Sequence, residues 1–410
     1  MDSCYTSSLM PLSEGLARLT DAITAVTEIE TVPLQAADGR IISAPIICPV
    51  NVPPADNSAM DGYALRAVDA PEAATQLQLI GRSMAGVPYH GTVNQGECVR
   101  IMTGAVIPQG ATAVVMQEQV VTNDESITFK RPVQIAQNIR RAGEDLKQGQ
   151  LLFEQGHRLR PADLGLLASI GIGEVALYRK PRVALISNGD ELIEPGRSLK
   201  AGQIYESNRY ALAALVRRLP IIVEEFGIIP DQPEALREAM TKAGRFDAVI
   251  SSGGVSVGDA DYIKIILDEL GEIDFWKLAI KPGKPFAFGS LGNAHYFGLP
   301  GNPVSAMVTC HQLAIPALRR LTGEHYVAPT PLVATTTGLL RKRPGRLDFQ
   351  RGRYQNGPDG KLLVSATGAQ GSGVMSSFCE ANCYIVLEQE RGSVEQGEQV
   401  EILPFDALMV

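Results

Sequence analysis

The sequence lacks most of the motifs that mark familiar classes of enzyme. It contains no GxxxxGK[ST] phosphate loop, no HExxH zinc motif, no GxSxG nucleophile elbow and no cysteine–histidine signature of thiol catalysis. Its five histidines are dispersed along 410 residues, so we expect each to be structural or exposed. These absences favour a site without a protein nucleophile, in which positioning and electrostatics drive the reaction.

Cysteines are few and form no metal-binding pattern. None of the six belongs to a CxxC pair. Cys379 and Cys383 are four residues apart, but no second pair completes a zinc site. We therefore predict scattered reduced thiols, as in cytoplasmic proteins.

Excess positive charge and long apolar runs are also missing. The formal net charge is −8, which disfavours a nucleic-acid partner. No apolar run reaches the roughly 20 residues of a membrane span, and the polar N-terminus does not resemble a signal peptide. We expect a cytoplasmic protein with no membrane partner, divided into several domains because 410 residues exceed one ordinary core.

The stretch 247–261, DAVISSGGVSVGDAD, is the strongest local signal. A short buried strand leads into Ser252, Gly253 and Gly254, and Asp259 and Asp261 follow where a helix should begin. A glycine turn between a strand and a helix start directs free N–H groups toward an anion. Two carboxylates beside such a turn suggest a divalent cation between the protein and a phosphate.

Strands and helices alternate from residue 181, which predicts a parallel sheet covered on both faces. Ligands of such sheets bind beyond the carboxyl ends of the strands. Five predicted strand ends carry polar, charged or glycine residues, and we expect them to converge on one site. These strand ends are Ser187 to Glu191, Asp231, Ser252 to Asp261, Lys277 with Lys281, and Pro300 to Pro303.

Several of these residues have two open interpretations. The carboxylates of Glu191, Asp231, Asp259 and Asp261 are suitable Mg²⁺ ligands, yet Asp231 is equally well placed as a helix N-cap, with Glu234 completing a capping box. Asp261 has the same ambiguity.

The IKPGKPFAF and GLPGNPVSA motifs provide candidate anion contacts. Lys281 and Lys284 stand on a loop stiffened by two prolines, and are either solvated or face an anion. Asn302 is a predicted helix cap, Pro303 occupies the first helical position, and Ser305 adds a hydroxyl in the first turn.

Two regions outside 181–327 are rich in β-type sequence. Residues 63–130 read as a small all-β module, and residues 328–410 as a separate barrel or sandwich with Arg346, Arg351 and Ser372 at its turns. In the loop before the first, Asp61 is either a turn residue or functional, and the same alternatives hold for Thr103.

Taken together, the motifs resemble the molybdopterin molybdenumtransferases, the bacterial MoeA type related to the E domain of gephyrin. The resemblance rests on the order of DNSAMDGYAL, RIMTGAVIP, NIRRAGED, SNGDEL, SSGGVSVGDADY, IKPGKPFAFG, GLPGNPVSA and GRLDFQRG. It implies an α/β multi-domain fold in four parts: a mixed linking segment (1–50 with 140–180), an inserted β module (51–139), a central parallel α/β molybdopterin-binding domain (181–327) and a C-terminal β-barrel (328–410).

The resemblance also implies a reaction, in which adenylylated molybdopterin and molybdate give molybdenum cofactor and AMP with Mg²⁺. It implies a homodimer whose site is shared between the α/β domain of one subunit and the β module of the other. Molybdopterin adenylyltransferase and molybdoenzyme maturation proteins are possible partners. Two other functions stay open: ATP-dependent adenylylation of molybdopterin, and a non-enzymatic cofactor-binding scaffold.

Residue roles carried over from the resemblance fall into groups. Asp61 and Thr103 are the implied acid and hydroxyl of the β module, and Arg140 and Asp145 belong to the linking set. The implied acids of the α/β domain are Glu191, Asp231 and Asp261, with Asp259 as a further metal ligand. The implied cofactor and oxyanion contacts are Ser252, Gly253, Gly254, Lys277, Lys281, Lys284, Pro300, Asn302, Pro303 and Ser305, with Arg351 and Ser372 as molybdate contacts. One departure is Asn188, which stands where the family often has threonine.

Overall fold

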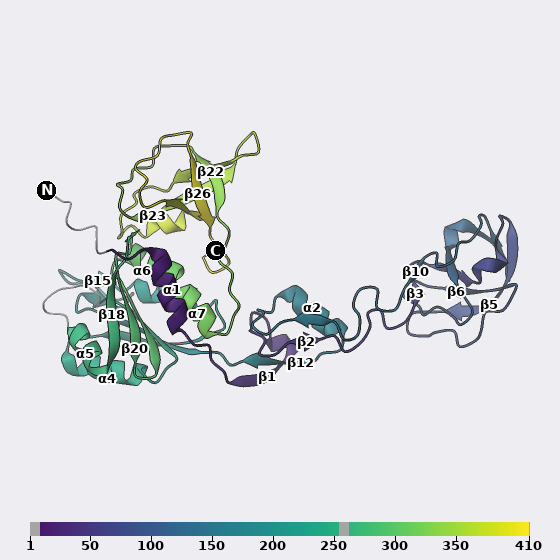
Figure 1. Ribbon diagram of the computed structural model, residues 1–410, viewed down its shortest axis with the longest axis horizontal. Coiled ribbons are helices and arrows are strands. Elements are labelled where there is room, and N and C mark those ends of the chain that lie inside the picture. The colour runs from purple at the N-terminus through teal and green to yellow at the C-terminus, as the bar shows by residue number, and fades with distance from the viewer. Residues whose placement is uncertain (1–8, 254–261, 410) are drawn as a thin grey trace.

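The computed structural model describes residues 9–253 and 262–409, and its parts follow one long axis (Figure 1). The α/β domain and the C-terminal barrel lie together at one end. A narrow linking segment leads from them to a β module at the opposite end (Figure 1). Over the described residues, no helix is both long and apolar enough to span a membrane.

The α/β domain is built on a six-stranded sheet of order β16-β13-β17-β21-β20-β18. The first four strands of this order are parallel neighbours, and β20 runs antiparallel to both β21 and β18. The predicted parallel sheet is therefore present, with one antiparallel strand near its edge. The strands are β13 (Arg182–Asn188), β16 (Ile222–Ile229), β17 (Ala248–Ser252), β18 (Gly271–Lys277), β20 (Pro285–Leu291) and β21 (Ala294–Leu299).

Helices cover both faces of this sheet because its central strands are apolar on both sides. Along β13, Val183 and Leu185 are buried in one core, whereas Ala184 and Ile186 are buried in the other. The first core contains α3 (Asn208–Val216), α6 (Pro303–Thr309), the π-helical turn η4 (Cys310–Ala314) and α7 (Ile315–Leu321). The second contains α4 (Pro233–Ala243) and α5 (Tyr262–Leu270).

Helix α1 (Leu12–Ala22) packs on the α/β domain. Its Leu19 is buried in the same core as Leu313 and Leu318. Just before it, Met10 donates its backbone N–H to the carbonyl of Lys277 at 2.8 Å. The predicted range 1–50 placed this helix in the linking segment; in the structure its apolar face is instead buried against α7 and η4.

The linking segment is made of two chain passages that pair with each other. Strand β1 (Ile29–Pro33) is antiparallel to β12 (Glu174–Tyr178), and β2 (Ile46–Ile47) to β11 (Leu151–Phe153). Helix α2 (Pro161–Ser169) covers them, and Leu167 lies in their shared core. Because a helix precedes β12, the GIGEVA stretch before and within that strand is not the strand–turn–helix of a dinucleotide site.

The β module carries a six-stranded sheet of order β7-β4-β6-β5-β9-β8. A two-stranded pair, β3 with β10, joins it to the linking segment. Its strands are β3 (Asn57–Ser58), β4 (Gly62–Leu65), β5 (Thr75–Ser83), β6 (Glu97–Ile101), β7 (Ala113–Met116), β8 (Val120–Asn123), β9 (Ser126–Phe129) and β10 (Ile139–Arg140).

The C-terminal part is a closed five-stranded barrel, because β23 pairs with both β24 and β25. The barrel strands are β22 (Leu332–Thr336), β23 (Leu347–Asn356), β24 (Leu362–Ala366), β25 (Cys383–Leu387) and β26 (Gln399–Pro404), and a short helix, α8 (Ser376–Cys379), precedes β25. Strand β19 (Ile280–Lys281) of the α/β domain pairs with β23. This pairing fixes the barrel to the α/β domain.

Candidate functional site

A cavity of about 1190 Å³ opens at the carboxyl ends of the parallel strands in the α/β domain. The ends of β13, β17, β18 and β21 contribute to its wall, together with the residues before α3 and at the start of α6. Both polar and aromatic side chains line it. The position agrees with the expectation that ligands of such sheets bind beyond the carboxyl edge.

Ten of the predicted site residues line this cavity. They come from five separate chain segments, so the predicted convergence is confirmed for them. They are Glu191, Asp231, Ser252, Gly253, Lys277, Lys284, Pro300, Asn302, Pro303 and Ser305.

The acidic side of the cavity is held together by hydrogen bonds between strand ends. Asn188 donates its side-chain amide to an Asp231 carboxylate oxygen at 3.1 Å, and the backbone N–H of Asp231 donates to Asp190 at 3.1 Å. Glu191 lines the same wall. Asn188, which departs from the family pattern, therefore positions an acid through its amide.

The capping box predicted for Asp231 and Glu234 is wrong. Helix α4 begins at Pro233 with Gln232 as its cap residue, and no side chain caps it. The carboxylate of Asp231 accepts from Asn188 instead. Asn302 is the cap residue of α6 as predicted, with Pro303 following it, but its side chain makes no cap hydrogen bond.

The glycine turn after β17 brings backbone close to backbone. Gly253 has φ +101°, and a Cβ there would lie 3.0 Å from the carbonyl oxygen of Asn188. Beside it, Asn208 donates to the hydroxyl of Ser252 and to the carbonyl of Gly301, both at 2.7 Å. Glycine is required at 253 because a side chain would be strained and would push apart the two strand ends.

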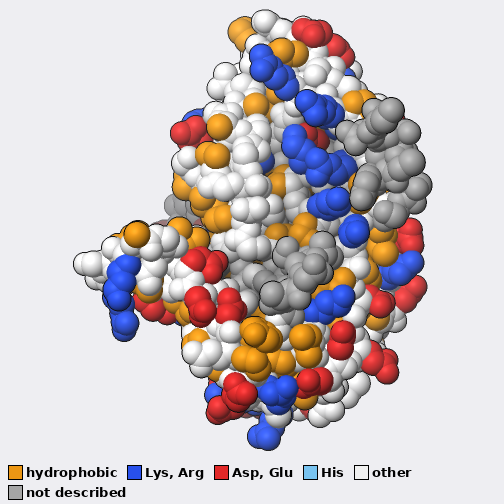
Figure 2. Space-filling model, turned by 90° about the vertical axis from the view of Figure 1, so that its left-hand side faces the viewer, with side chains coloured by type: hydrophobic (Ala, Val, Ile, Leu, Met, Phe, Trp, Pro, Cys, Tyr) orange, Lys and Arg blue, Asp and Glu red, His pale blue; other side chains and the backbone are white. Residues whose placement is uncertain are grey.

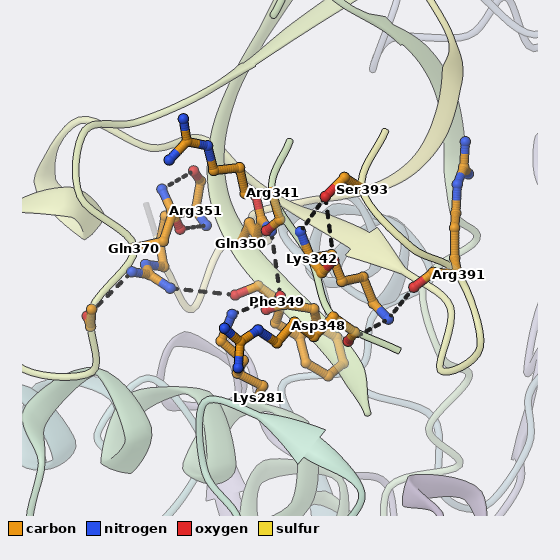
Figure 3. Close-up of polar contacts among 12 residues, drawn as sticks. Lys281, Arg341, Lys342, Asp348, Phe349, Gln350, Arg351, Gln370, Arg391 and Ser393 are labelled. Atoms are coloured by element: carbon orange, nitrogen blue, oxygen red, sulfur yellow. Dashed lines mark hydrogen bonds and ion pairs between the residues drawn. The ribbon is translucent and has the colours of Figure 1, made fainter. Parts of the chain in front are cut away.

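Two of the three predicted lysines face the cavity and one does not. Lys277 and Lys284 line it, and neither ammonium group has a carboxylate partner within the described residues. Lys281 instead pairs at 3.0 Å with Asp348 of the barrel, whose side chain is only 4% exposed (Figure 3). Strand β19 turns Lys281 toward the barrel, so its predicted place in the cavity is corrected.

Arg351 lies on strand β23 and is absent from the cavity lining; its cross-strand partner, Tyr384, is buried in the core that the barrel shares with the α/β domain. Arg351 is 1% exposed, and its guanidinium donates to the hydroxyl of Ser377 at 3.0 Å and to the carbonyl of Gly371 at 3.3 Å (Figure 3). The neighbouring Ser372 accepts at its carbonyl from the N–H of Val304 in α6, at 3.0 Å. These two predicted molybdate contacts thus hold a barrel loop against the helix that borders the cavity.

Asp61 and Thr103 form a pair in the β module. One carboxylate oxygen of Asp61 accepts both the backbone N–H and the hydroxyl of Thr103 at 2.7 Å. These hydrogen bonds from Thr103 lower the pKa of Asp61 below its ordinary value of 3.8. The module stands at the far end of the molecule from the cavity (Figure 1), so one chain does not bring this pair to the α/β acids.

Three predicted residues, Gly254, Asp259 and Asp261, lie outside the described residues. Within the residues that are described, no three His, Cys, Asp or Glu side chains gather as a metal site. The described carboxylates of the cavity wall are those of Asp190, Glu191, Glu206 and Asp231.

Sequence reasoning missed a second polar wall, from Glu206 to Asn208. Glu206 is 2% exposed, and one of its carboxylate oxygens has no hydrogen-bond partner among residues 9–253 and 262–409. Within the same residues, the amide oxygens of Asn188 and Asn208 and the indole N–H of Trp276 are also buried without a partner. All four residues line the cavity. The sequence signal for Glu206 and Asn208 is ESN, an acid and an amide at the start of a helix, a pattern that is equally typical of an ordinary helix start.

The α/β and barrel end of the molecule carries an uneven distribution of charge. Figure 2 shows Lys and Arg side chains gathered in a band on the upper, barrel side of this face, with Asp and Glu more frequent below. A local positive field of this kind attracts anionic substrates although the whole chain is acidic.

Comparison with known families accounts for nearly the whole chain. Residues 10–171 match the MoeA N-terminal region (domain I and II), residues 184–320 match a probable molybdopterin binding domain, and residues 333–405 match the MoeA C-terminal region (domain IV). The middle match contains the cavity.

Curated relatives and solved structures agree with these matches. A molybdopterin molybdenumtransferase of Haemophilus influenzae is 47% identical over 98% of this chain and 100% of its own. That of Synechococcus elongatus is 35% identical over 91% of this chain and 94% of its own. A molybdopterin biosynthesis moeA protein of Pyrococcus horikoshii superposes with a TM-score of 0.85 at 32% identity, covering 97% of this chain and 100% of that one. This chain therefore belongs to the molybdopterin molybdenumtransferases, enzymes of molybdenum cofactor biosynthesis.

Proposed function

We propose that the chain inserts molybdate into adenylylated molybdopterin, giving molybdenum cofactor and AMP in a Mg²⁺-dependent reaction. The observation that carries this proposal is that strand-end acids line the same cavity as two lysines that have no carboxylate partner among the described residues. The acids would bind a cation, and the lysines would bind the phosphate groups of an anhydride.

The lysine side of the cavity supports binding of a phosphorylated ligand. Lys277 and Lys284 reach the cavity from strand β18 and from the loop before β20. Ser305, which is 5% exposed, and the glycine turn at Gly253 add short polar groups beside them. Ammonium groups without internal partners stabilise phosphate charge, which increases on the leaving AMP as the anhydride bond breaks.

The acidic side supports a Mg²⁺ ion. Asp190, Glu191 and Asp231 supply carboxylate oxygens, the ligands that Mg²⁺ takes while keeping waters and substrate phosphates in its shell. Only one oxygen of Asp231 is engaged by Asn188. A bound Mg²⁺ would supply electrostatic stabilisation of the anhydride oxygens. Asp259 and Asp261 remain proposed ligands.

The size and lining of the cavity support a ligand with two ring systems. Its volume of about 1190 Å³ exceeds what a single small metabolite fills. Tyr205, Phe275 and Trp276 offer flat apolar surfaces, and buried polar atoms without partners lie beside them. A pterin joined to a nucleotide matches these features, because each ring has apolar faces and hydrogen-bonding edges.

A homodimer would complete the site. The linking segment and the β module together form an arm (residues 29–178) that does not fold back on its own α/β domain (Figure 1). In the module, Asp61 is half-buried and is hydrogen-bonded to Thr103, which is exposed. We propose that Asp61 and Thr103 enter the cavity of a second copy of the chain. Arg140 and Asp145 would lie near them, where the β module joins the linking segment. Cytoplasmic location, and exchange of cofactor with an adenylyltransferase and maturation proteins, belong to the same proposal.

The test is release of AMP from adenylylated molybdopterin with molybdate, with and without Mg²⁺, in wild type and Glu191→Gln. We expect at least a hundredfold loss in the variant, and no loss in Glu234→Gln, an exposed glutamate on α4. Undiminished AMP release by Glu191→Gln would contradict the assigned site. Consumption of ATP with free molybdopterin would favour the adenylyltransferase, and return of unchanged pterin the scaffold.

A further inference from the structure

A second cavity, of about 590 Å³, lies at the opposite edge of the α/β sheet. Its wall includes Arg182 and Ile222, which begin β13 and β16, and Asp247, which precedes β17. Because β13 spans seven residues, about 20 Å separate this cavity from the candidate active site. Nothing in the proposed reaction uses it.

The wall of this cavity is strongly basic. Five cations and two carboxylates line it, with one apolar residue, Ile222: the cations are Arg40, Arg179, Lys180, Arg182 and Arg245, and the carboxylates are Glu30 and Asp247. In a chain of net charge −8, a local excess of three positive charges is unusual.

Both carboxylates of the wall are already engaged. Asp247 accepts two hydrogen bonds from the guanidinium of Arg179, at 2.7 and 2.8 Å, and one from the backbone N–H of Arg182 at 2.7 Å. These contacts hold the pKa of Asp247 below its ordinary value despite its burial. Glu30 is bound by Arg40. Neither acid is free to neutralise the remaining cations. Arg182 pairs instead with Glu224 outside the wall, at 3.3 Å, and Arg179 also pairs with Glu28, at 3.2 Å.

Three positive groups of the wall are left with unused donors. Lys180 and Arg245 are exposed, and within the described residues neither side chain has an acidic partner. Arg40 is only 5% exposed, and its Nε has no hydrogen-bond partner in the part of the chain that the structure describes. A buried guanidinium N–H without an acceptor is costly, and an anion in the cavity would remove that cost.

We propose that this cavity binds a small tetrahedral oxyanion of the phosphate or molybdate type. A dianion matches the two cations, Lys180 and Arg245, that have no acidic partner among the described residues. Its oxygens also suit guanidinium and ammonium donors that approach from several sides. Arg40 belongs to the linking segment, whereas Arg182 and Arg245 belong to the α/β domain. The bound anion would therefore connect the base of the arm to the sheet.

The binding test is calorimetric titration of the whole protein with inorganic phosphate, and separately with molybdate, at constant ionic strength. The variant is Lys180→Gln with Arg245→Gln; both side chains are exposed, so folding should be preserved. We expect at least tenfold weaker binding at one of the sites detected in wild type. The matched control, Arg131→Gln with Lys147→Gln, has the same charge change at exposed positions in the arm and should leave the titration unchanged.

Location is tested by soaking crystals with selenate and measuring its anomalous diffraction. A selenium peak between Arg40 and Arg245, absent from the double variant, supports the site. Peaks confined to the cavity at the carboxyl edge, or equal weakening in the control variant, would overturn it. The ion that binds more tightly in solution, phosphate or molybdate, identifies the source of the ligand. AMP release without added phosphate should be equal in the double variant and wild type, so this test is separate from that of the reaction.

Discussion

The cavity differs from the barrel seam, which is the region where β19 meets β23 and which contains Lys281, Asp348, Gln350 and Arg351. Both regions contain buried or half-buried polar side chains, but those at the seam have more hydrogen-bond partners. At the seam, Asp348 is bonded by Lys281 and Gln350, and Arg351 donates to a hydroxyl and to backbone carbonyls (Figure 3). In the cavity, Glu206 and Trp276 each have a buried polar atom for which the described residues supply no partner. Buried polar groups whose hydrogen bonds are complete stabilise a structure, whereas polar groups in a cavity that lack a hydrogen-bond partner are suited to bind a ligand.

The largest effect should come from removing an acid of the cavity. Asp231→Asn keeps the hydrogen-bonding shape and removes the charge, so we expect AMP release to fall at least about a hundredfold, roughly 3 kcal/mol of transition-state stabilisation. Unfolding by urea should change by less than about 1 kcal/mol, since the side chain is only partly buried. Asp274→Asn, an exposed acid of β18, is the control. Equal activities of Asp231→Asn and Asp274→Asn would mean that the acids of the cavity have no special role in the reaction.

A substitution at the barrel seam should reduce the stability of the protein, in contrast to the loss of activity expected at the cavity. Arg351→Met removes the guanidinium that donates to the carbonyls of Phe349 and Gly371 and to the hydroxyl of Ser377. We expect the free energy of unfolding to fall by about 3 kcal/mol, measured by urea denaturation. Arg353→Met, two residues along the same strand and exposed, should change it by less than about 0.5 kcal/mol. A comparable loss in both variants would mean that burial of Arg351 is unimportant.

Two lysines three residues apart give a sharper contrast. Lys281→Met removes the ammonium partner of buried Asp348, at a cost of about 1 kcal/mol in stability because Lys281 itself is 42% exposed. Lys284→Met should leave stability unchanged and slow AMP release by about tenfold, because its ammonium faces the cavity. Thermal unfolding should show a loss for Lys281→Met only, and the AMP release assay should show the larger loss for Lys284→Met. The same ranking in both assays would contradict it.

The smallest effect concerns Asp61. Thr103→Val removes one of the two hydrogen bonds to its carboxylate, so the pKa of Asp61 should rise toward 3.8, measured by NMR titration. Since folding lowers this pKa, the stabilisation from the pair is complete above 3.8 and is lost as the pH falls through the lower folded value. The stability difference between wild type and Thr103→Val should therefore shrink in acid. A difference that grows in acid would mean that the hydrogen bonds do not favour the charged form.

The rule that ligands bind beyond the carboxyl ends of parallel strands predicted most of the candidate site from the sequence. It placed Asp231, Ser252 and Lys277 in one cavity, although they are distant in the sequence. It failed for Lys281 because the pairing of β19 with β23 depends on a strand 66 residues later (347 − 281).

Local patterns misled where tertiary contacts override them. Asp231 has the spacing of a cap, yet Asn188, brought close by the parallel pairing of β13 with β16, takes its carboxylate. Helix α1 carries an apolar stripe that suits any core, and nothing local identifies α7 as its neighbour. Glu206 was missed because its burial depends on the cavity, not on its neighbours in sequence.

The arm is built so that outgoing and returning chain are fastened to each other along its length. Residues 29–33 pair with 174–178, 46–47 with 151–153, and 57–58 with 139–140, and Val52 bridges to Leu146. A protease that cuts the outgoing chain at any one place would leave both fragments attached through the opposite passage. Nicked protein should therefore elute from a sizing column as the uncut form does, and separate into fragments only in denaturant.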